Sequence, residues 1–143
     1  MRRLQVSRLL AILATLLSVY ILIRLWPQIA PYQDMWPLPG LYLLEMVWLP
    51  LIGVALTFLD YRWAVLGMWA IPGAVLGFAI LGALTVGPAY LPVFLLLAVS
   101  TFLRPAQDLR QYLGGLAVGI CGGAVQIGYM LAVLKVLQQI AGS

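Results

Sequence analysis

The chain has no histidine and a single cysteine among its 143 residues. Without histidine, it cannot itself ligate haem or zinc through imidazole or supply the base of a Ser-His pair. One cysteine excludes an intrachain disulfide, a Cys-x-x-Cys redox pair and a cysteine metal cluster. We therefore expect no catalytic residue, no bound metal and no cofactor, and we predict that the protein is not an enzyme. Cys121 lies in a long apolar run and is expected to be buried and inert.

Charged side chains are also scarce. The chain has eight basic and four acidic residues, which make up 8% of the sequence, whereas a soluble domain carries roughly 25%. Apolar residues make up 64%, and the mean hydropathy is +1.07. So few charges cannot cover a surface in water, so lipid is the expected solvent, and no nucleic-acid partner is expected. The predicted fold class is all-α, a polytopic transmembrane helix bundle.

Long apolar runs set the number of predicted spans, because crossing the membrane takes about 20 apolar residues. The sequence predicts a single transmembrane domain over residues 1–143, with five spans at about 4–26, 41–59, 63–84, 86–103 and 113–137. The fourth span is the shortest, since Gly87, Pro88 and Pro92 interrupt its apolar run. Pro88 fits the first turn of a helix, where its missing N–H would have no partner. The alternative is four spans plus a re-entrant segment.

Basic residues predict the orientation, because they are retained on the cytoplasmic side of a membrane. With a cytoplasmic N-terminus, six arginines fall inside, against Arg24 and Lys135 outside: Arg2, Arg3, Arg8, Arg62, Arg104 and Arg110. A re-entrant fourth segment would reduce this bias to five against three. We therefore predict a multi-pass protein of the plasma (inner) membrane. The charged residues of the inner loops are interpreted as topology determinants or as solvated pairs: Asp60, Arg62, Arg104, Asp108 and Arg110.

Two polar residues inside the predicted spans are candidates for function. Glu45 lies about one turn inside the outer end of the second span. A carboxylate there costs free energy unless it is protonated, paired or hydrated, and such groups often mark ion or proton paths. The alternative is an ion pair with Arg24, which ends the first span on the same side. Gln126 lies near the middle of the fifth span, where an interhelical hydrogen bond is the alternative to lining a path.

Glycines recur at helical spacing in the third and fifth spans. They are Gly67, Gly73 and Gly77 in the third span, and Gly115, Gly119, Gly122 and Gly123 in the fifth. Small residues at this spacing allow another backbone to approach closely and gain dispersion contacts. The pattern predicts helix–helix interfaces, formed either by packing of the third span on the fifth within one chain or against another subunit.

Paired glycine ridges and few reactive groups favour a non-catalytic accessory or scaffold subunit of a membrane assembly. The expected partners are the lipid bilayer and either further copies of the chain or other membrane subunits. The alternative is a small oligomeric transporter or channel whose path is lined by Glu45 and Gln126. The two hypotheses differ in whether these side chains face a hydrated cavity or a helix interface. An intramembrane enzyme is least favoured, since no nucleophile with a base can be assembled.

Overall fold

The computed structural model describes residues 2–29, 38–59, 62–83, 86–104 and 109–141. These residues form five α-helices and one 3-10 helix: α1 (Arg2–Ile29), α2 (Leu38–Thr57), α3 (Arg62–Leu81), η2 (Gly87–Tyr90), α4 (Leu91–Phe102) and α5 (Leu109–Ala141). The all-α prediction is confirmed. Residue 84, the predicted end of the third span, lies outside the described residues, as do Asp60 and Asp108.

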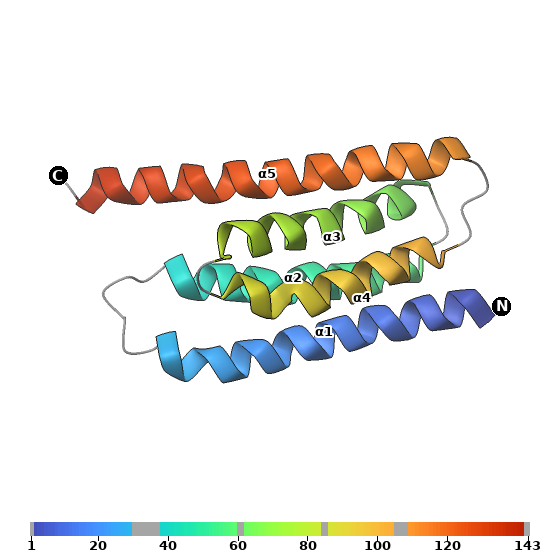
Figure 1. Cartoon of the computed structure of the whole chain (residues 1–143), viewed down its shortest axis with the longest axis horizontal. Helices are drawn as coiled ribbons and strands as arrows, with labels where there is room; N and C mark the ends of the chain where they lie inside the picture. Colours follow the sequence, from blue (N-terminus) through green and yellow to red (C-terminus); the bar gives the residue numbers. More distant parts are fainter. Residues whose placement is uncertain (1, 30–37, 60–61, 84–85, 105–108, 142–143) are drawn as a thin grey trace.

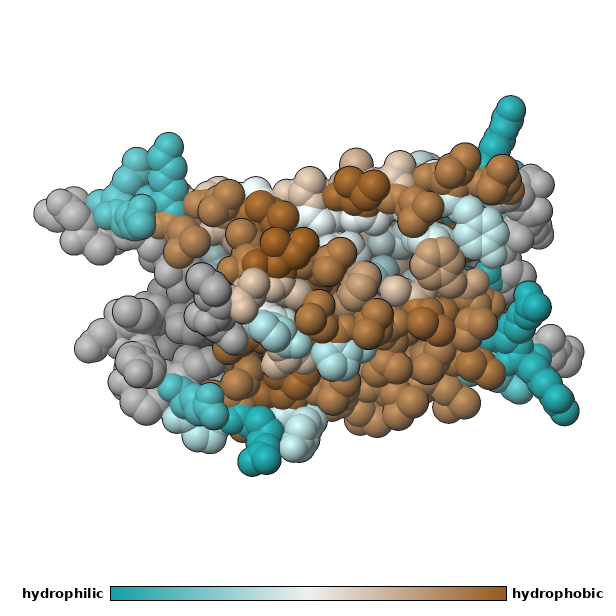
Figure 2. Space-filling model, in the orientation of Figure 1, coloured by the Kyte–Doolittle hydropathy of each residue, from teal (hydrophilic) through white to brown (hydrophobic). Residues whose placement is uncertain are grey.

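Three of the described helices are long and apolar enough to cross a membrane: α1 over residues 2–28, α3 over 62–81 and α5 over 109–136. The apolar stretches of α2 (Tyr42–Thr57) and of η2 with α4 (Gly87–Phe102) are shorter. Figure 2 shows hydrophobic residues over the middle of the molecule and hydrophilic residues at its two ends. This distribution matches a slab of hydrocarbon between two aqueous faces.

The predicted fourth span is a 3-10 turn followed by an α-helix. Pro88 lies in the first turn of η2, and Pro92 lies in the first turn of α4. Neither proline interrupts a helix interior, because each stands where its missing N–H would have no intrahelical partner. Gly87 makes the preceding turn possible, since its N–H donates to Gly82 O at 2.7 Å and a side chain at Gly87 would meet the carbonyl of Ala79.

The helices run side by side along the long axis of the molecule (Figure 1). α3 packs against α5, α4 and α2, and α1 packs against α2 and α4, so that α5 and α1 are the outermost helices. A cluster of buried side chains lies mainly between α1, α2, α3 and η2 with α4, and it includes Met46, Val75, Phe78 and Tyr90. Figure 1 also shows α5 extending well beyond the end of α3.

Small hydroxyl groups join the inner helices through hydrogen bonds to backbone carbonyls. Ser7 of α1 and Ser100 of α4 donate to each other's carbonyl oxygens, each at 2.7 Å. Ser18 of α1 donates to Met46 O of α2 at 2.5 Å, and Thr101 of α4 donates to Met68 O of α3 at 3.0 Å. Each bond satisfies a hydroxyl that would otherwise be buried without a partner, which costs free energy.

Candidate functional site

Glu45 and Gln126 come together where α5 passes the end of α3. Glu45 lies in the first turns of α2, and Gln126 lies three residues after Gly123 on α5. The Gln126 side chain lies near the Glu45 carboxyl group. One turn away, Tyr42 of α2 donates a hydrogen bond to Met130 O of α5 at 3.2 Å. The two residues singled out by sequence are therefore neighbours, contributed by helices that contact each other little elsewhere.

The Glu45 and Gln126 side chains are neighbours, but in the described part of the chain each has a polar atom without a hydrogen-bond partner. Within the described residues, Glu45 Oε2 and Gln126 Nε2 are buried without a hydrogen-bond partner. Gln126 is only 6% exposed, so this unpaired N–H group faces the protein interior. Buried unpaired polar atoms are uncommon in folded proteins because each costs free energy. This pair contrasts with the serines of α1 and α4, whose hydroxyls are all bonded.

The alternative pairing of Glu45 with Arg24 is not formed. Both residues are described, and Arg24 instead donates from Nε to Tyr20 OH on its own helix, at 3.1 Å. The Arg24 guanidinium also lies over the Tyr20 ring, 5.9 Å from its centroid. Arg24 is exposed, and its described contacts are with Tyr20 of its own helix.

The glycine ridges of α3 and α5 face each other. A side chain at Gly73 would overlap the backbone of Gly119, and one at Gly77 would come within 2.7 Å of Gly123 O. The fit continues where Gly122 faces Ala70 and where Gly115 lies against the Trp69 ring. Dispersion between closely apposed backbones therefore holds these two helices together.

Gly67 lies apart from the α3–α5 contact. A side chain at Gly67 would come within 2.9 Å of Leu56 Cδ1, which belongs to α2. It is therefore at the contact of α3 with α2. Its spacing in the sequence grouped Gly67 with the other glycines of the third span, but Gly67 faces α2 and the others face α5.

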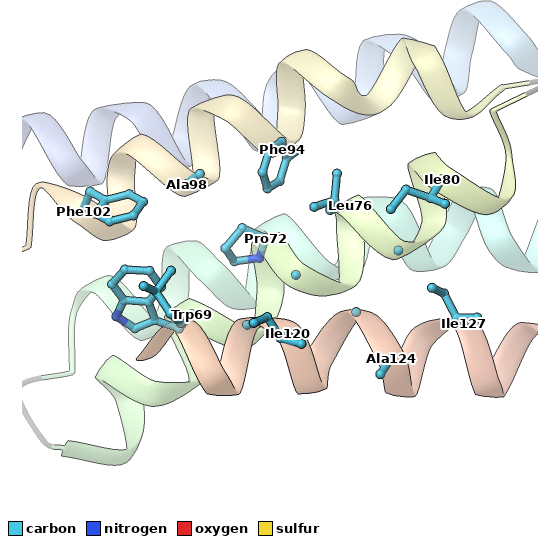
Figure 3. A pocket seen from close by; sticks show the side chains of 15 residues that line it. Trp69, Pro72, Leu76, Ile80, Phe94, Ala98, Phe102, Ile120, Ala124 and Ile127 are labelled. Carbon is cyan, nitrogen blue, oxygen red and sulfur yellow. The ribbon is translucent and has the colours of Figure 1, made fainter. Parts of the chain in front are cut away.

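An apolar groove runs beside the glycine contact, between α3, α4 and α5 (Figure 3). Its volume is about 470 Å³, and fifteen residues line it. Trp69 and Phe102 lie at one end, and Ile80 and Ile127 lie at the other. The groove opens to the surroundings, because Phe102 and Ile80 are 50% and 58% exposed. Sequence reasoning missed this groove, which arises where α4 and α5 diverge on either side of α3.

Arg104 is buried, so its interpretation as a solvated loop residue is wrong. It is 6% exposed. Its Nη1 donates to Leu56 O at 3.1 Å and to Met68 Sδ at 2.9 Å, and its Nη2 donates to Leu59 O at 2.5 Å. The last carbonyls of an α-helix lack the donors that serve its interior, so a guanidinium is well suited to donate hydrogen bonds there. Arg104 thus ties the end of α4 to the end of α2.

Cys121 is exposed, which corrects the expectation that it is buried. It faces away from α3, in a row of exposed residues along α5 that are small except for Val125 and that we term the outer stripe: Gly114, Ala117, Cys121, Val125, Gly128 and Ala132. Side chains added at Gly114 or Gly128 would meet no atom within 4 Å. α5 therefore has small residues on two sides, one packed against α3 and one uncovered.

Among the described residues, no group of three or more His, Cys, Asp or Glu side chains is close enough to hold a metal ion. Comparisons with protein-family models, with curated proteins and with solved structures find no match for the chain. The properties of the site therefore rest on its residues alone.

Proposed function

We propose that this chain is a five-span integral membrane protein with a cytoplasmic N-terminus, which acts as a non-catalytic accessory or scaffold subunit of a membrane assembly. Three helices long and apolar enough to cross a membrane support the location. The remaining two crossings would be α2 and the η2–α4 segment, which run alongside the other three (Figure 1).

The position of residues 87–104 supports a crossing over a re-entrant segment. Gly87 begins this segment beside Gly82, at the end of α3. Arg104 ends it beside the carbonyls of Leu56, in the last turn of α2, and of Leu59, which lies between α2 and the start of α3. The two ends of the segment thus lie at opposite ends of α3. A re-entrant segment would return to the side from which it started.

Charge at the two ends of the bundle supports the orientation. The alternating helix directions gather six arginines at the end that contains the N-terminus: Arg2, Arg3, Arg8, Arg62, Arg104 and Arg110. Arg24 and Lys135 lie toward the opposite end. Such an excess is typical of the cytoplasmic side.

The observation that carries the accessory role is the uncovered surface of α5. Only 11% of its apolar span is buried, against 56% for α3. The glycine ridge predicted to face either α3 or a partner is occupied by α3, which leaves the outer stripe for a second helix. Small residues on a lipid-facing side favour a close helix partner, because lipid tails pack less well than an apposed backbone.

The test is gentle extraction of the tagged protein from its native membrane, with mass spectrometry of what accompanies it. We expect stoichiometric membrane partners, which are lost from a Cys121→Leu/Gly128→Leu variant whose leucines block close approach to the outer stripe. The matched control is Ala55→Leu, an exposed position on α2 that should keep the partners. A wild-type particle that contains only this chain would contradict the accessory role.

A transporter or channel is the second candidate, and the unpaired atoms of Glu45 and Gln126 favour it. Buried carboxyl groups without a basic partner are found along proton and ion paths. The probe is a pH-sensitive dye inside proteoliposomes that hold the purified protein. A transporter should dissipate an imposed pH gradient, and Glu45→Gln should abolish this flux, while Gln138→Glu, an exposed position near the end of α5, should not. No flux from the wild-type protein would count against this candidate.

A further inference from the structure

We propose that Glu45 and Gln126 form a binding site for one proton, and that this proton attaches the outer part of α5 to α2. The outer part comprises residues 126–141, which we term the α5 arm. The inference rests on the proposed membrane location. It requires that a proton binds and not that it crosses the membrane, and it is independent of any protein partner at the outer stripe.

The α5 arm is attached to the bundle by few side chains. Gln126 and Met130 are buried, at 6% and 8% exposed. From residue 131 to residue 139 the described side chains are exposed, except for the half-buried Val133. Gly123, three residues before the buried glutamine, is the last glycine of α5 that lies against α3. The arm therefore depends mainly on the side of α5 that faces α2.

Glu45 and Gln126 are fully complementary only when Glu45 carries a proton. A neutral carboxyl group and an amide group each offer the other one donor and one acceptor, so two hydrogen bonds can join them. Glu45 Oε2 and Gln126 Nε2, which are buried and unpaired within the described residues, are the acceptor and the donor of one such bond. The proton supplies the donor of the other, to Gln126 Oε1. An ionised carboxylate can only accept.

No basic side chain of the described residues lies near enough to Glu45 to compensate its negative charge. Arg24 contacts Tyr20 on its own helix, and Lys135 is exposed more than two turns beyond Gln126. An unpaired charge away from water costs far more free energy than a neutral, hydrogen-bonded group. Proton binding removes this charge, so we expect the α5 arm to be attached more firmly when Glu45 is neutral.

Glu45 is the only acidic side chain among the described residues, and the chain has no histidine. α3 and α4 contribute no titratable side chain to this end of the bundle. The other helices contribute the basic residues Arg24 and Lys135 and tyrosines, which ordinarily ionise only above about pH 9. The tyrosines are Tyr20 on α1, Tyr42 on α2, Tyr90 on η2 and Tyr129 on α5. A change from about pH 5 to about pH 8 thus acts here on Glu45.

The experiment measures the distance between two spin labels by double electron–electron resonance, with the protein in lipid nanodiscs at about pH 5 and about pH 8. The labels are attached at Ile52→Cys on α2 and Leu134→Cys on the α5 arm, both exposed positions, in a Cys121→Ser background. We expect one short distance at the lower pH and a longer, broader distribution at the higher pH. The ratio of attached to released arms should fall at least about threefold, the factor for one interhelical hydrogen bond.

Variants separate the proton from the rest of the contact. Glu45→Gln should keep the arm attached at both pH values, because its amide is neutral and can still pair with Gln126. Tyr42→Phe removes the hydrogen bond to Met130 O but not the proton site, so it should weaken attachment equally at both pH values. Labels at Trp63→Cys and Leu113→Cys, on the inner parts of α3 and α5, are the matched control and should not respond to pH. Circular dichroism checks the helices of each variant.

A wild-type distance distribution that is the same at both pH values would overturn the proposal, whether or not the variants fold. A pH response that persists in Glu45→Gln would also overturn it. Exchanging potassium for sodium at the higher pH should change nothing. If sodium restores attachment, the site binds a metal cation, and the proton site is wrong.

Alkaline carbonate extraction of native membranes separates this inference from the proposed function. If the wild-type protein is released into the supernatant, the membrane location fails and the proton site fails with it. If the protein stays in the membrane pellet but its α5 arm does not respond to pH, only the proton site is overturned.

Discussion

The α1–α4 contact and the α3–α5 contact join helices by opposite means. Ser7 and Ser100 donate hydrogen bonds to each other's carbonyls, so the first contact depends on two hydroxyls. Gly73 and Gly119 place backbone against backbone, so the second depends on missing side chains. Removing a hydroxyl leaves the α1–α4 shape intact. Adding a side chain to the α3–α5 contact forces the helices apart, so it should be the more sensitive of the two.

Gly73→Leu should have the largest effect, because its side chain would overlap the Gly119 backbone, which cannot move aside as a flexible side chain can. We expect a loss of more than about 3 kcal/mol in the free energy of unfolding, measured by SDS titration in mixed micelles with circular dichroism. The control is Gly128→Leu, which makes the same substitution at a glycine of α5 where an added side chain would meet no atom within 4 Å. A similar loss in both variants would mean that the two helices are not held by close backbone contact.

Arg104→Gln should have the next largest effect, because it removes a buried charge. The Arg104 guanidinium joins helices through polar contacts, as the hydroxyls of Ser7 and Ser100 do. Arg104 donates to the carbonyl of Leu56 in the last turn of α2 and to that of Leu59 just after it, and hydrogen bonds from a charged group contribute about 1.5 to 3 kcal/mol. We expect the same titration to show a loss of about 2 to 3 kcal/mol. Arg62→Gln removes the same charge from an exposed position and should change stability by less than about 0.5 kcal/mol.

Ser7→Ala should have the smallest effect. Hydrogen bonds between membrane helices contribute about 0.6 kcal/mol on average and at most about 1.7 kcal/mol. The control is Thr15→Ala, since Thr15 donates only to Ala11 O within α1 and should leave the α1–α4 contact unchanged. A double-mutant cycle with Ser100→Ala measures the coupling of the two hydroxyls, whose oxygens are 3.1 Å apart. Zero coupling energy would show that the two bonds act independently.

The extent of the helices could be predicted from the sequence because their apolar runs are long and bounded by charges or prolines. All five predicted spans overlap helices, and the 86–103 prediction matches η2 with α4 to within about a residue at each end. The predicted spans at 4–26 and 113–137 are shorter at both ends than α1 and α5. Polar residues such as Gln138 and Gln139 continue a helix without adding apolar signal, so hydropathy marks the lipid-facing part of a helix and not its full length.

The partners of individual side chains were predicted less well. The spacing of small residues indicates which of them share a helix face, but not which helix packs on that face. Gly67 was therefore grouped with residues that contact α5. Arg104 has the same local sequence character as a solvated loop arginine, and its partners lie 45 and 48 residues away. The exposure of Cys121 depends on which side of α5 meets α3, and both sides carry small residues. Glu45 and Gln126 were identified by their polarity alone, but nothing in the sequence indicated that they are neighbours.

In the membrane location that we propose, the length of α5 couples the whole molecule to membrane thickness. Its apolar span of 28 residues is about 42 Å long at about 1.5 Å per residue, against a hydrocarbon core of about 30 Å. A helix with this mismatch tilts in the bilayer. Because the glycine contact fixes α5 along α3, α5 cannot tilt alone, and the remaining helices must lean with it. A thinner membrane would thus incline the entire bundle, and a thicker one would bring it upright.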